Sequence, residues 1–274
     1  MMRVVLLGLL CTQPLLAAAQ DLKVLADRHA RISERYEAKD YAAVVREIDA
    51  QMKESSGTPY TDSLHRYLYK YGRAHRKLKD AQAGVEAAER IYALVKARGN
   101  ADHELEALFD LSWTYYDVGE MKQCARVDSI AVAVADSDPK VPTAQRGRAR
   151  QYLAFDYSVL GDHRNSGKWA LAAIAQYEKA DSIPPAQWAE SYTAAGVAAW
   201  HLGRIREAEG YYQQALERLG DGTAEALLIR KVSAYGNLGV LWQNAGDFIR
   251  AKNNYHESLR YSDRVVAGTQ DQFT

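Results

Sequence analysis

The sequence predicts an all-α protein, a right-handed α-solenoid of about six helix-turn-helix repeats. The first observation behind this prediction is that Gly, Ala and aromatic residues return at the same internal offsets every 40 to 43 residues. The second is that apolar residues recur at spacings of three and four, as amphipathic helices require, and that no stretch alternates as a strand would. We therefore expect helical hairpins that stack in sequence order, and no β-sheet.

The first 19 residues lie outside the repeats and have the features of a secretory signal peptide. Arg3 gives a short positive start, residues 4–10 are apolar, and residues 17–19 are three alanines at the expected cleavage site. This apolar run is shorter than the roughly 20 residues that span a bilayer, which disfavours a retained anchor. Lipid attachment at Cys11 is disfavoured too, because Leu10 is too large for the residue before a lipoprotein cysteine. We expect cleavage and a soluble product outside the cytoplasm, in a bacterial periplasm.

The repeat array is expected to occupy residues 20–274. Its copies begin near residues 25, 65, 105, 147, 189 and 232; the first is degenerate and the second matches the pattern loosely. Each of the later copies has a Gly that is expected to end the first helix, since Gly adopts positive φ without a Cβ clash: Gly119, Gly161, Gly203 and Gly246. Small residues are expected where the two helices of a hairpin cross: Gly196, Gly239, Ala208, Ala215 and Ala251.

The clearest copy resembles the tetratricopeptide repeat, a helix-turn-helix unit. It contains Tyr235, Leu238, Gly239, Trp242, Gly246, Ala251 and Tyr255. Its period is longer than the 34 residues of that family and is similar to the 40-to-42-residue variant of kinesin-light-chain-like arrays. The resemblance implies a non-catalytic scaffold that binds a protein or peptide partner. Exported arrays of this period also resemble the N-terminal sensory segments of bacterial sensor kinases and of CHAT-domain proteases.

Composition and motifs give no sign of other chemistry. The 35 basic and 35 acidic residues cancel, so neither nucleic acid nor an anionic membrane is an implied partner. Cys124 is the single cysteine after cleavage and is expected to be a buried substitute for Ala. The histidines show no zinc-ligand spacing, and residues 161–168 only approximate a phosphate-binding loop. We expect no cofactor, no metal and no enzymatic activity.

The resemblance also implies where a partner binds. In this family, recurring positions of the first helices face a concave groove. Carried over residue by residue, the candidates are Arg66, Tyr69, Arg73, Arg76, Phe109, Trp113, Tyr116, Arg148, Gln151, Phe155, Trp200, His201 and Asn237. The N-terminal part of this set is basic and its middle is aromatic. One alternative stays open: a one-residue shift in register moves Trp113, Tyr116, Phe155 and Trp200 from the groove into the core.

The last repeat raises a further expectation. Its final helix carries Tyr255, Leu259 and Val266 on an apolar side, and a terminal repeat normally has a polar cap. We expect the chain to continue beyond residue 274, or a partner or a second copy to cover this side. The alternative functions are a SusD-like glycan-binding or small-ligand-binding protein and an accessory segment of a CHAT-type protease.

Overall fold

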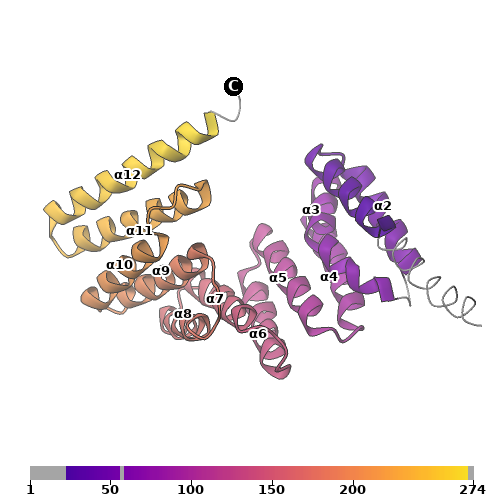
Figure 1. Cartoon of the computed structure of the whole chain (residues 1–274), viewed down its shortest axis with the longest axis horizontal. Coiled ribbons are helices and arrows are strands. Elements are labelled where there is room, and N and C mark those ends of the chain that lie inside the picture. Colours follow the sequence, from indigo (N-terminus) through magenta and orange to yellow (C-terminus); the bar gives the residue numbers. More distant parts are fainter. Residues whose placement is uncertain (1–22, 56–58, 271–274) are drawn as a thin grey trace, which may run out of the picture. The chain divides into compact units, whose positions relative to one another are not determined.

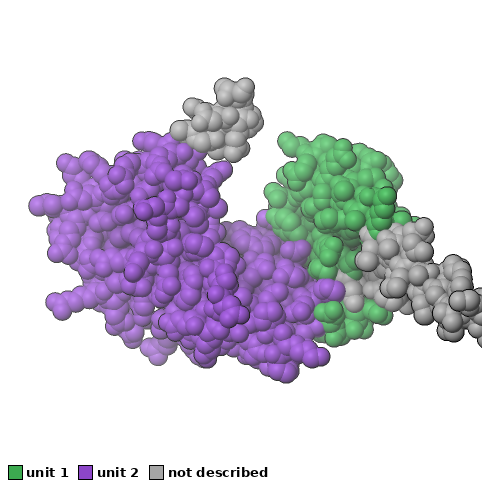
Figure 2. All heavy atoms as spheres, in the orientation of Figure 1, with its two compact units in different colours: residues 1–100 green, residues 101–274 purple. Residues whose placement is uncertain are grey.

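The computed structural model describes residues 23–55 and 59–270, and within these ranges the chain forms helices and no strand (Figure 1). The all-α prediction is confirmed. The chain divides into two compact units, Met1–Asn100 and Ala101–Thr274 (Figure 2). The predicted signal peptide, residues 1–19, lies outside the described residues. No helix in the described ranges is long and apolar enough to cross a membrane.

The first unit consists of short hairpins. Residues 23–37 are helical, and they are followed by α2 (Tyr41–Ser55), the 3-10 helix η1 (Pro59–Tyr67), α3 (Leu68–Leu78) and α4 (Ala81–Lys96). Its core is formed by fully buried side chains such as Ile32, Ile48, Tyr71 and Ile91. The start of α4 is stabilised by Asp80, whose carboxylate accepts a hydrogen bond from the Ala83 backbone N–H at 2.8 Å.

The second unit contains four longer hairpins. Its helices are α5 (Ala101–Asp117), α6 (Met121–Ser137), α7 (Thr143–Val159), α8 (His163–Tyr177), α9 (Pro185–His201), α10 (Ile205–Leu219), α11 (Glu225–Asn244) and α12 (Phe248–Gln270). Each helix packs against the next one in the chain, and α9 also packs against α7 and α11. The hairpins therefore stack in sequence order with first helices beside first helices, as in an α-solenoid.

The turn inside each of the four hairpins of this unit contains a glycine in the left-handed region. Gly161 has φ 78°, and Asp162 donates its backbone N–H to the carbonyl of Tyr157 at 2.9 Å. Asp162 then caps α8 by accepting a hydrogen bond from the Asn165 backbone N–H at 3.1 Å. The predicted first-helix ends are confirmed, because Gly119, Gly203 and Gly246 also have positive φ.

Close contact between the helices of a hairpin depends on glycine. A Cβ placed on Gly196 would lie 2.6 Å from Cε1 of Tyr212, and one on Gly239 would lie 2.4 Å from Cε1 of Tyr255. Tyr212 is fully buried. Two of the small residues predicted at the crossings, Gly196 and Gly239, are therefore required by the aromatic ring that faces each of them.

Large apolar side chains are exposed on α12. Phe248 and Ile249 are 70% and 77% exposed, and Leu259 and Val266 are more than half exposed. Tyr255 is half-buried, and its hydroxyl donates to Oε1 of Gln243 at 2.6 Å. Helix α12 thus packs on α11 through one side and leaves apolar surface on another.

Candidate functional site

A cavity of about 480 Å³ lies in the second unit, between the first helices of its four hairpins. It is lined by Ser112, Trp113 and Tyr116 of α5, Asp128 of α6, Gln151, Tyr152, Phe155, Asp156 and Ser158 of α7, Glu190, Thr193, Ala194 and Val197 of α9, and Ile229, Arg230 and Ser233 of α11. Side chains separated by more than 100 residues in the sequence therefore face one space, because successive first helices stand side by side.

One wall of the cavity is aromatic. Trp113, Tyr116 and Phe155 are 40%, 40% and 41% exposed, which is unusual for side chains of this size. The Trp113 ring centroid lies 5.3 Å from that of Tyr116 and 6.0 Å from that of Tyr152, and both pairs meet edge to face. The rings of Tyr116 and Phe155 lie 5.6 Å apart. These contacts hold the rings in place while a part of each ring stays open to a ligand.

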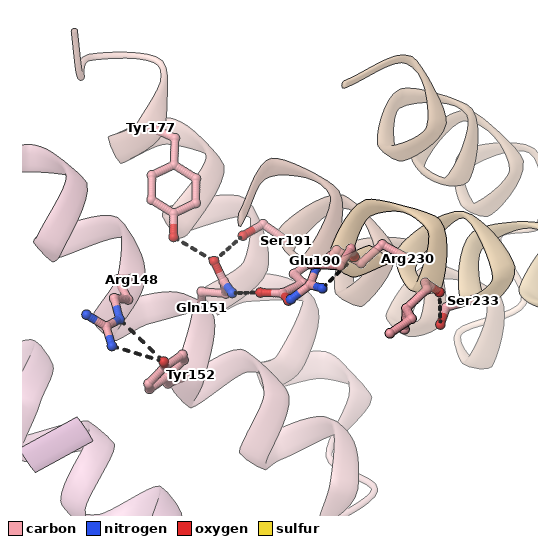
Figure 3. A network of polar contacts seen from close by, with 10 residues as sticks. Arg148, Gln151, Tyr152, Tyr177, Glu190, Ser191, Arg230 and Ser233 are labelled. Atoms are coloured by element: carbon pink, nitrogen blue, oxygen red, sulfur yellow. Dashed lines mark hydrogen bonds and ion pairs between the residues drawn. The ribbon is translucent and has the colours of Figure 1, made fainter. Parts of the chain in front are cut away.

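A polar network includes the lining residues Gln151, Glu190 and Arg230 (Figure 3). The amide oxygen of Gln151 accepts hydrogen bonds from the Tyr177 hydroxyl at 2.6 Å and the Ser191 hydroxyl at 3.4 Å. Its amide nitrogen donates to Glu190, which is also ion-paired with Arg230. The network connects α7, α8, α9 and α11, fixes the orientation of the Gln151 amide and offsets the charge of Glu190.

The floor of the cavity holds two buried carboxyl groups. Asp128 accepts a hydrogen bond from the Ser112 hydroxyl at 2.8 Å, and the side chain of Asp156 lies within hydrogen-bonding reach of Asp128. Burial, followed by the charge of the neighbouring Asp156, raises the pKa of Asp128 well above its ordinary value. Burial also raises the pKa of Asp156 to about 7. Protons thus stay on this pair at pH values where most carboxyl groups are ionised.

Two of the predicted residues support the cavity from outside its lining. Arg148 forms an ion pair with Glu106 at 3.1 Å, and its guanidinium group lies 4.4 Å from the centroid of the Phe109 ring. Phe109 is fully buried, so its predicted place in the groove is wrong: Arg148 and Tyr152 of α7 cover it. Helices α5 and α7 are therefore joined beside the cavity by a charged pair and by two rings that meet edge to face.

The structure brings four predicted residues together in the lining: Trp113, Tyr116, Gln151 and Phe155. Three others on α9 and α11 lie outside it. Trp200 packs against the buried cluster that contains Ala199 and Tyr212, as the alternative register suggested. The imidazole of His201 stacks on that of His163 at 3.7 Å, and Asn237 is half-buried on α11.

The basic candidates belong to the first unit. Arg66 lies in the last turn of η1 with an exposed side chain, whereas Tyr69, Arg73 and Arg76 lie on α3. Arg73 donates to the Tyr69 hydroxyl at 3.0 Å and packs against the same ring. These residues form a separate group from the lining of the cavity.

The lining residues that the prediction missed include Tyr152, Asp128, Asp156 and Arg230. Arg230 follows Glu190 by 40 residues, which is one period, but α11 begins at Glu225, before the expected repeat start near residue 232. The two aspartates had a detectable signal, because each stands on a helix face that is otherwise small or apolar. An acid at such a position indicates either a buried pair or a site.

Comparisons with known proteins agree with this architecture. The tetratricopeptide repeat family model matches residues 189–218, the hairpin of α9 and α10. No curated protein matches the chain in sequence.

Solved structures are similar in fold. BtubC (BKLC) from P. vanneervenii has a TM-score of 0.65 at 16% identity, over 87% of this chain and 91% of that one. A Podosopora anserina putative kinesin light chain with nearly identical TPR-like repeats has a TM-score of 0.57 at 15% identity, over 75% and 97% of the two chains. The apo form of RapI has a TM-score of 0.61 at 9% identity, over 88% and 75%. The chain thus contains a match to the tetratricopeptide repeat at residues 189–218, and it has the α-solenoid fold of these solved structures.

Proposed function

We propose that this protein is a non-catalytic scaffold that holds a peptide segment of a partner protein in the cavity of its second unit. Stacked helical repeats of this type typically serve protein–protein interaction. The single observation that carries the proposal is the convergence of three aromatic side chains, each about 40% exposed, on one cavity between successive first helices. Partly exposed aromatic side chains held by their neighbours are the usual anchors of protein interfaces.

The rest of the lining suits a peptide as well. Hydroxyl groups of Ser158, Thr193 and Ser233 lie around the aromatic wall and could bond a peptide main chain. Ala194 and Val197 add small apolar surface on α9. A peptide in this place would thus find anchors for its side chains and partners for its backbone, the two requirements of recognition in a groove.

The one cysteine of the described residues is unsuited to thiol catalysis. Cys124 is fully buried, and its thiol donates to the Ser112 carbonyl oxygen at 3.4 Å. Burial raises the pKa of this thiol to about 12, so the nucleophilic thiolate is scarce at neutral pH. This supports the scaffold proposal over covalent chemistry at Cys124.

The proposal is tested by site-specific photo-crosslinking. A photoreactive amino acid at Tyr116 is expected to label one partner segment in periplasmic extract, and the labelled peptide is identified by mass spectrometry. The Trp113→Ala, Phe155→Ala double variant should lose this product. The matched control is Phe248→Ala, Ile249→Ala, which removes two exposed apolar side chains from α12 and should keep it. Retention of the product in the first double variant, with unchanged helical content, would refute the groove assignment.

A second candidate function is the binding of a small ligand, such as a glycan. A cavity of about 480 Å³ lies in the size range of small-molecule sites, and exposed aromatic rings provide flat apolar surface for one. Mass spectrometry of the protein under native conditions separates the two candidates. A bound small molecule that the Trp113→Ala, Phe155→Ala variant loses would favour this second function.

We also propose that the protein acts outside the cytoplasm of a bacterium, after removal of residues 1–19. The charged start, the apolar run and the alanines before Gln20 support this. The test is the mass of the mature protein in a periplasmic fraction. An N-terminus at Gln20 is expected, and recovery of the uncleaved chain from the cytoplasm would contradict it.

The exposed apolar side of α12 supports a second contact. We propose that a following segment, a partner or a second copy covers Leu259 and its neighbours, as in a sensory or docking part of a larger protein or an accessory segment of a CHAT-type protease. Sedimentation at increasing concentration tests self-association. A monomer at every concentration that also binds no hydrophobic dye would count against a contact here.

A further inference from the structure

The general scaffold function gives no role to two acidic side chains at the floor of the cavity. Asp128 of α6 is 1% exposed, and Asp156 of α7 is 2% exposed. Oδ2 of Asp128 is satisfied by the Ser112 hydroxyl. Oδ1 of Asp128 and Oδ2 of Asp156 receive no hydrogen bond from any N–H or hydroxyl group of the described chain. Both residues line the cavity and are almost fully buried, so we infer that their carboxyl groups lie at its inner end.

The charged side chains near the floor of the cavity leave the aspartate pair without a cationic partner in the described chain. Among the acidic lining residues, Glu190 is already paired with Arg230. Arg148 of α7 acts on Asp128 from a distance but forms its own ion pair with Glu106. Cys124, the other titratable neighbour, stays neutral because burial raises its pKa to about 12. The aspartate pair is thus the acidic group of the cavity that has no ion-pair partner in the described chain.

The aromatic wall of the cavity is also suited to a cation. The faces of Trp113, Tyr116, Tyr152 and Phe155 carry the negative side of an aromatic quadrupole, which attracts ammonium and guanidinium groups. The same rings accept an aliphatic stem by apolar contact. A cavity lined by both aromatic rings and buried carboxyl groups therefore suits a long side chain that is apolar along its length and cationic at its end.

We propose that the cavity binds a lysine or arginine side chain of the partner peptide, with its stem between Trp113, Tyr116 and Phe155 and its charged end at the carboxyl groups of Asp128 and Asp156. This inference rests on the proposed function, in which a peptide occupies the cavity. When the cation arrives, one carboxyl group of the pair releases its proton to bulk water, and the carboxylate that forms pairs with the cation while the other carboxyl group keeps its proton. Binding is thus coupled to release of a proton, and affinity rises with pH.

The test uses the full mature chain and two small probes, n-butylammonium and n-butylguanidinium. Each reproduces one basic side chain, and 1-butanol is the neutral control. Binding is followed by the NMR shift of the Trp113 indole N–H. Both cations are expected to shift this signal saturably, with at least about tenfold tighter binding at pH 8 than at pH 6, since one proton is released in this range. A response to 1-butanol equal to that of the cations would overturn the proposal.

Variants of the two aspartates test whether their carboxyl groups bind the cation. Asp128→Asn and Asp156→Asn keep the shape of the side chains, and each is expected to weaken binding of the cations at least about tenfold, as loss of a buried ion pair does. The control Glu178→Gln removes an exposed carboxylate just after α8 and should change nothing. Unchanged cation binding in both aspartate variants, with native helical content, would overturn the proposal.

A peptide distinguishes a protein partner from a free amine. The probe is acetyl-Gly-Ala-Lys-Ala-Gly-amide, and its control has norleucine in place of lysine. The lysine peptide is expected to bind about tenfold more tightly than n-butylammonium, because the cavity also offers groups for the main chain. Equal affinity would mean that a free amine is the ligand and would overturn the peptide source. If neither cation binds while crosslinking at Tyr116 still depends on Trp113 and Phe155, this inference fails and the proposed function stands.

Discussion

The ring of Tyr212 in α10 occupies the space that a side chain on Gly196 of α9 would need, so that a Cβ there would lie 2.6 Å from Cε1. The contact lies at the crossing of the hairpin that the family model matches. Tyr212 is fully buried, and Gly196 is buried beside it. The approach of the two helices is therefore set by one glycine and one ring.

Gly196→Ala is expected to lower the free energy of unfolding by about 1–3 kcal/mol, because the added methyl group forces the buried ring or the helix to move. The matched control is Gly210→Ala in α10, where a Cβ meets nothing within 4 Å. This control should gain up to about 1 kcal/mol from higher helix propensity. Urea unfolding followed by circular dichroism measures both. Equal stability of the two variants would show that the helix crossing can accommodate a methyl group.

The stability of the second unit is expected to depend on pH through Asp156. Its pKa is about 7 in the folded chain and 3.8 as an ordinary value, so between these pH values the folded state binds more protons than the unfolded state. The free energy of unfolding should therefore fall as pH rises from 4 through 7, by at most about 4 kcal/mol for this group.

The measurement is the thermal midpoint of wild type and Asp156→Asn across this pH range. The amide cannot ionise, so the variant should show a flatter profile and a higher midpoint than wild type above pH 7. A steeper profile in the variant would contradict the assignment to Asp156.

Tyr177→Phe tests the network at Gln151. The Tyr177 hydroxyl is buried and donates to the Gln151 amide oxygen at 2.6 Å. Its removal leaves that oxygen with only the longer bond from Ser191, and we expect a loss of about 1–2 kcal/mol in the free energy of unfolding. Chemical denaturation gives this value. The double variant Tyr177→Phe, Gln151→Leu should lose less than the sum of the two single changes, since the two residues form one interaction.

Two tryptophans allow binding and stability to be separated. Trp113→Ala is expected to reduce crosslinking of the partner at Tyr116 while lowering the free energy of unfolding by about 1 kcal/mol or less, because the side chain is 40% exposed and its ring contacts with Tyr116 and Tyr152 are edge to face. Trp200→Ala should cost about 2 kcal/mol through lost packing and leave crosslinking unchanged. The opposite pattern would mean that the register placing Trp113 in the cavity is wrong.

Much of the fold was predictable because hairpin geometry leaves a local signature. Gly161 and Gly203 mark turns that need positive φ, and Gly196 marks a crossing that needs no side chain; each requirement repeats once per period. The cavity could be predicted only in part. Trp113, Tyr116, Gln151 and Phe155 follow from repeat positions, but Phe109 was placed wrongly because burial by Arg148 and Tyr152 involves a neighbouring repeat.

The pairing of Asp128 with Asp156 was beyond the pattern for a similar reason. These residues belong to different hairpins, and a repeat pattern describes what recurs within one hairpin rather than what meets between two. Arg230 was missed because α11 starts earlier than the period implies, which adds residues on the cavity side before the expected repeat start.

Two ion pairs, Glu106 with Arg148 and Glu190 with Arg230, connect neighbouring first helices at separations of 42 and 40 residues. Each ion pair holds the first helix of one hairpin against the first helix of the next hairpin. The spacing of the first helices around the cavity is thereby fixed before a ligand binds. High salt screens ion pairs and should therefore make the solenoid of the second unit more flexible. The second unit would then bend on the side away from these ion pairs while the entrance of the cavity keeps its shape.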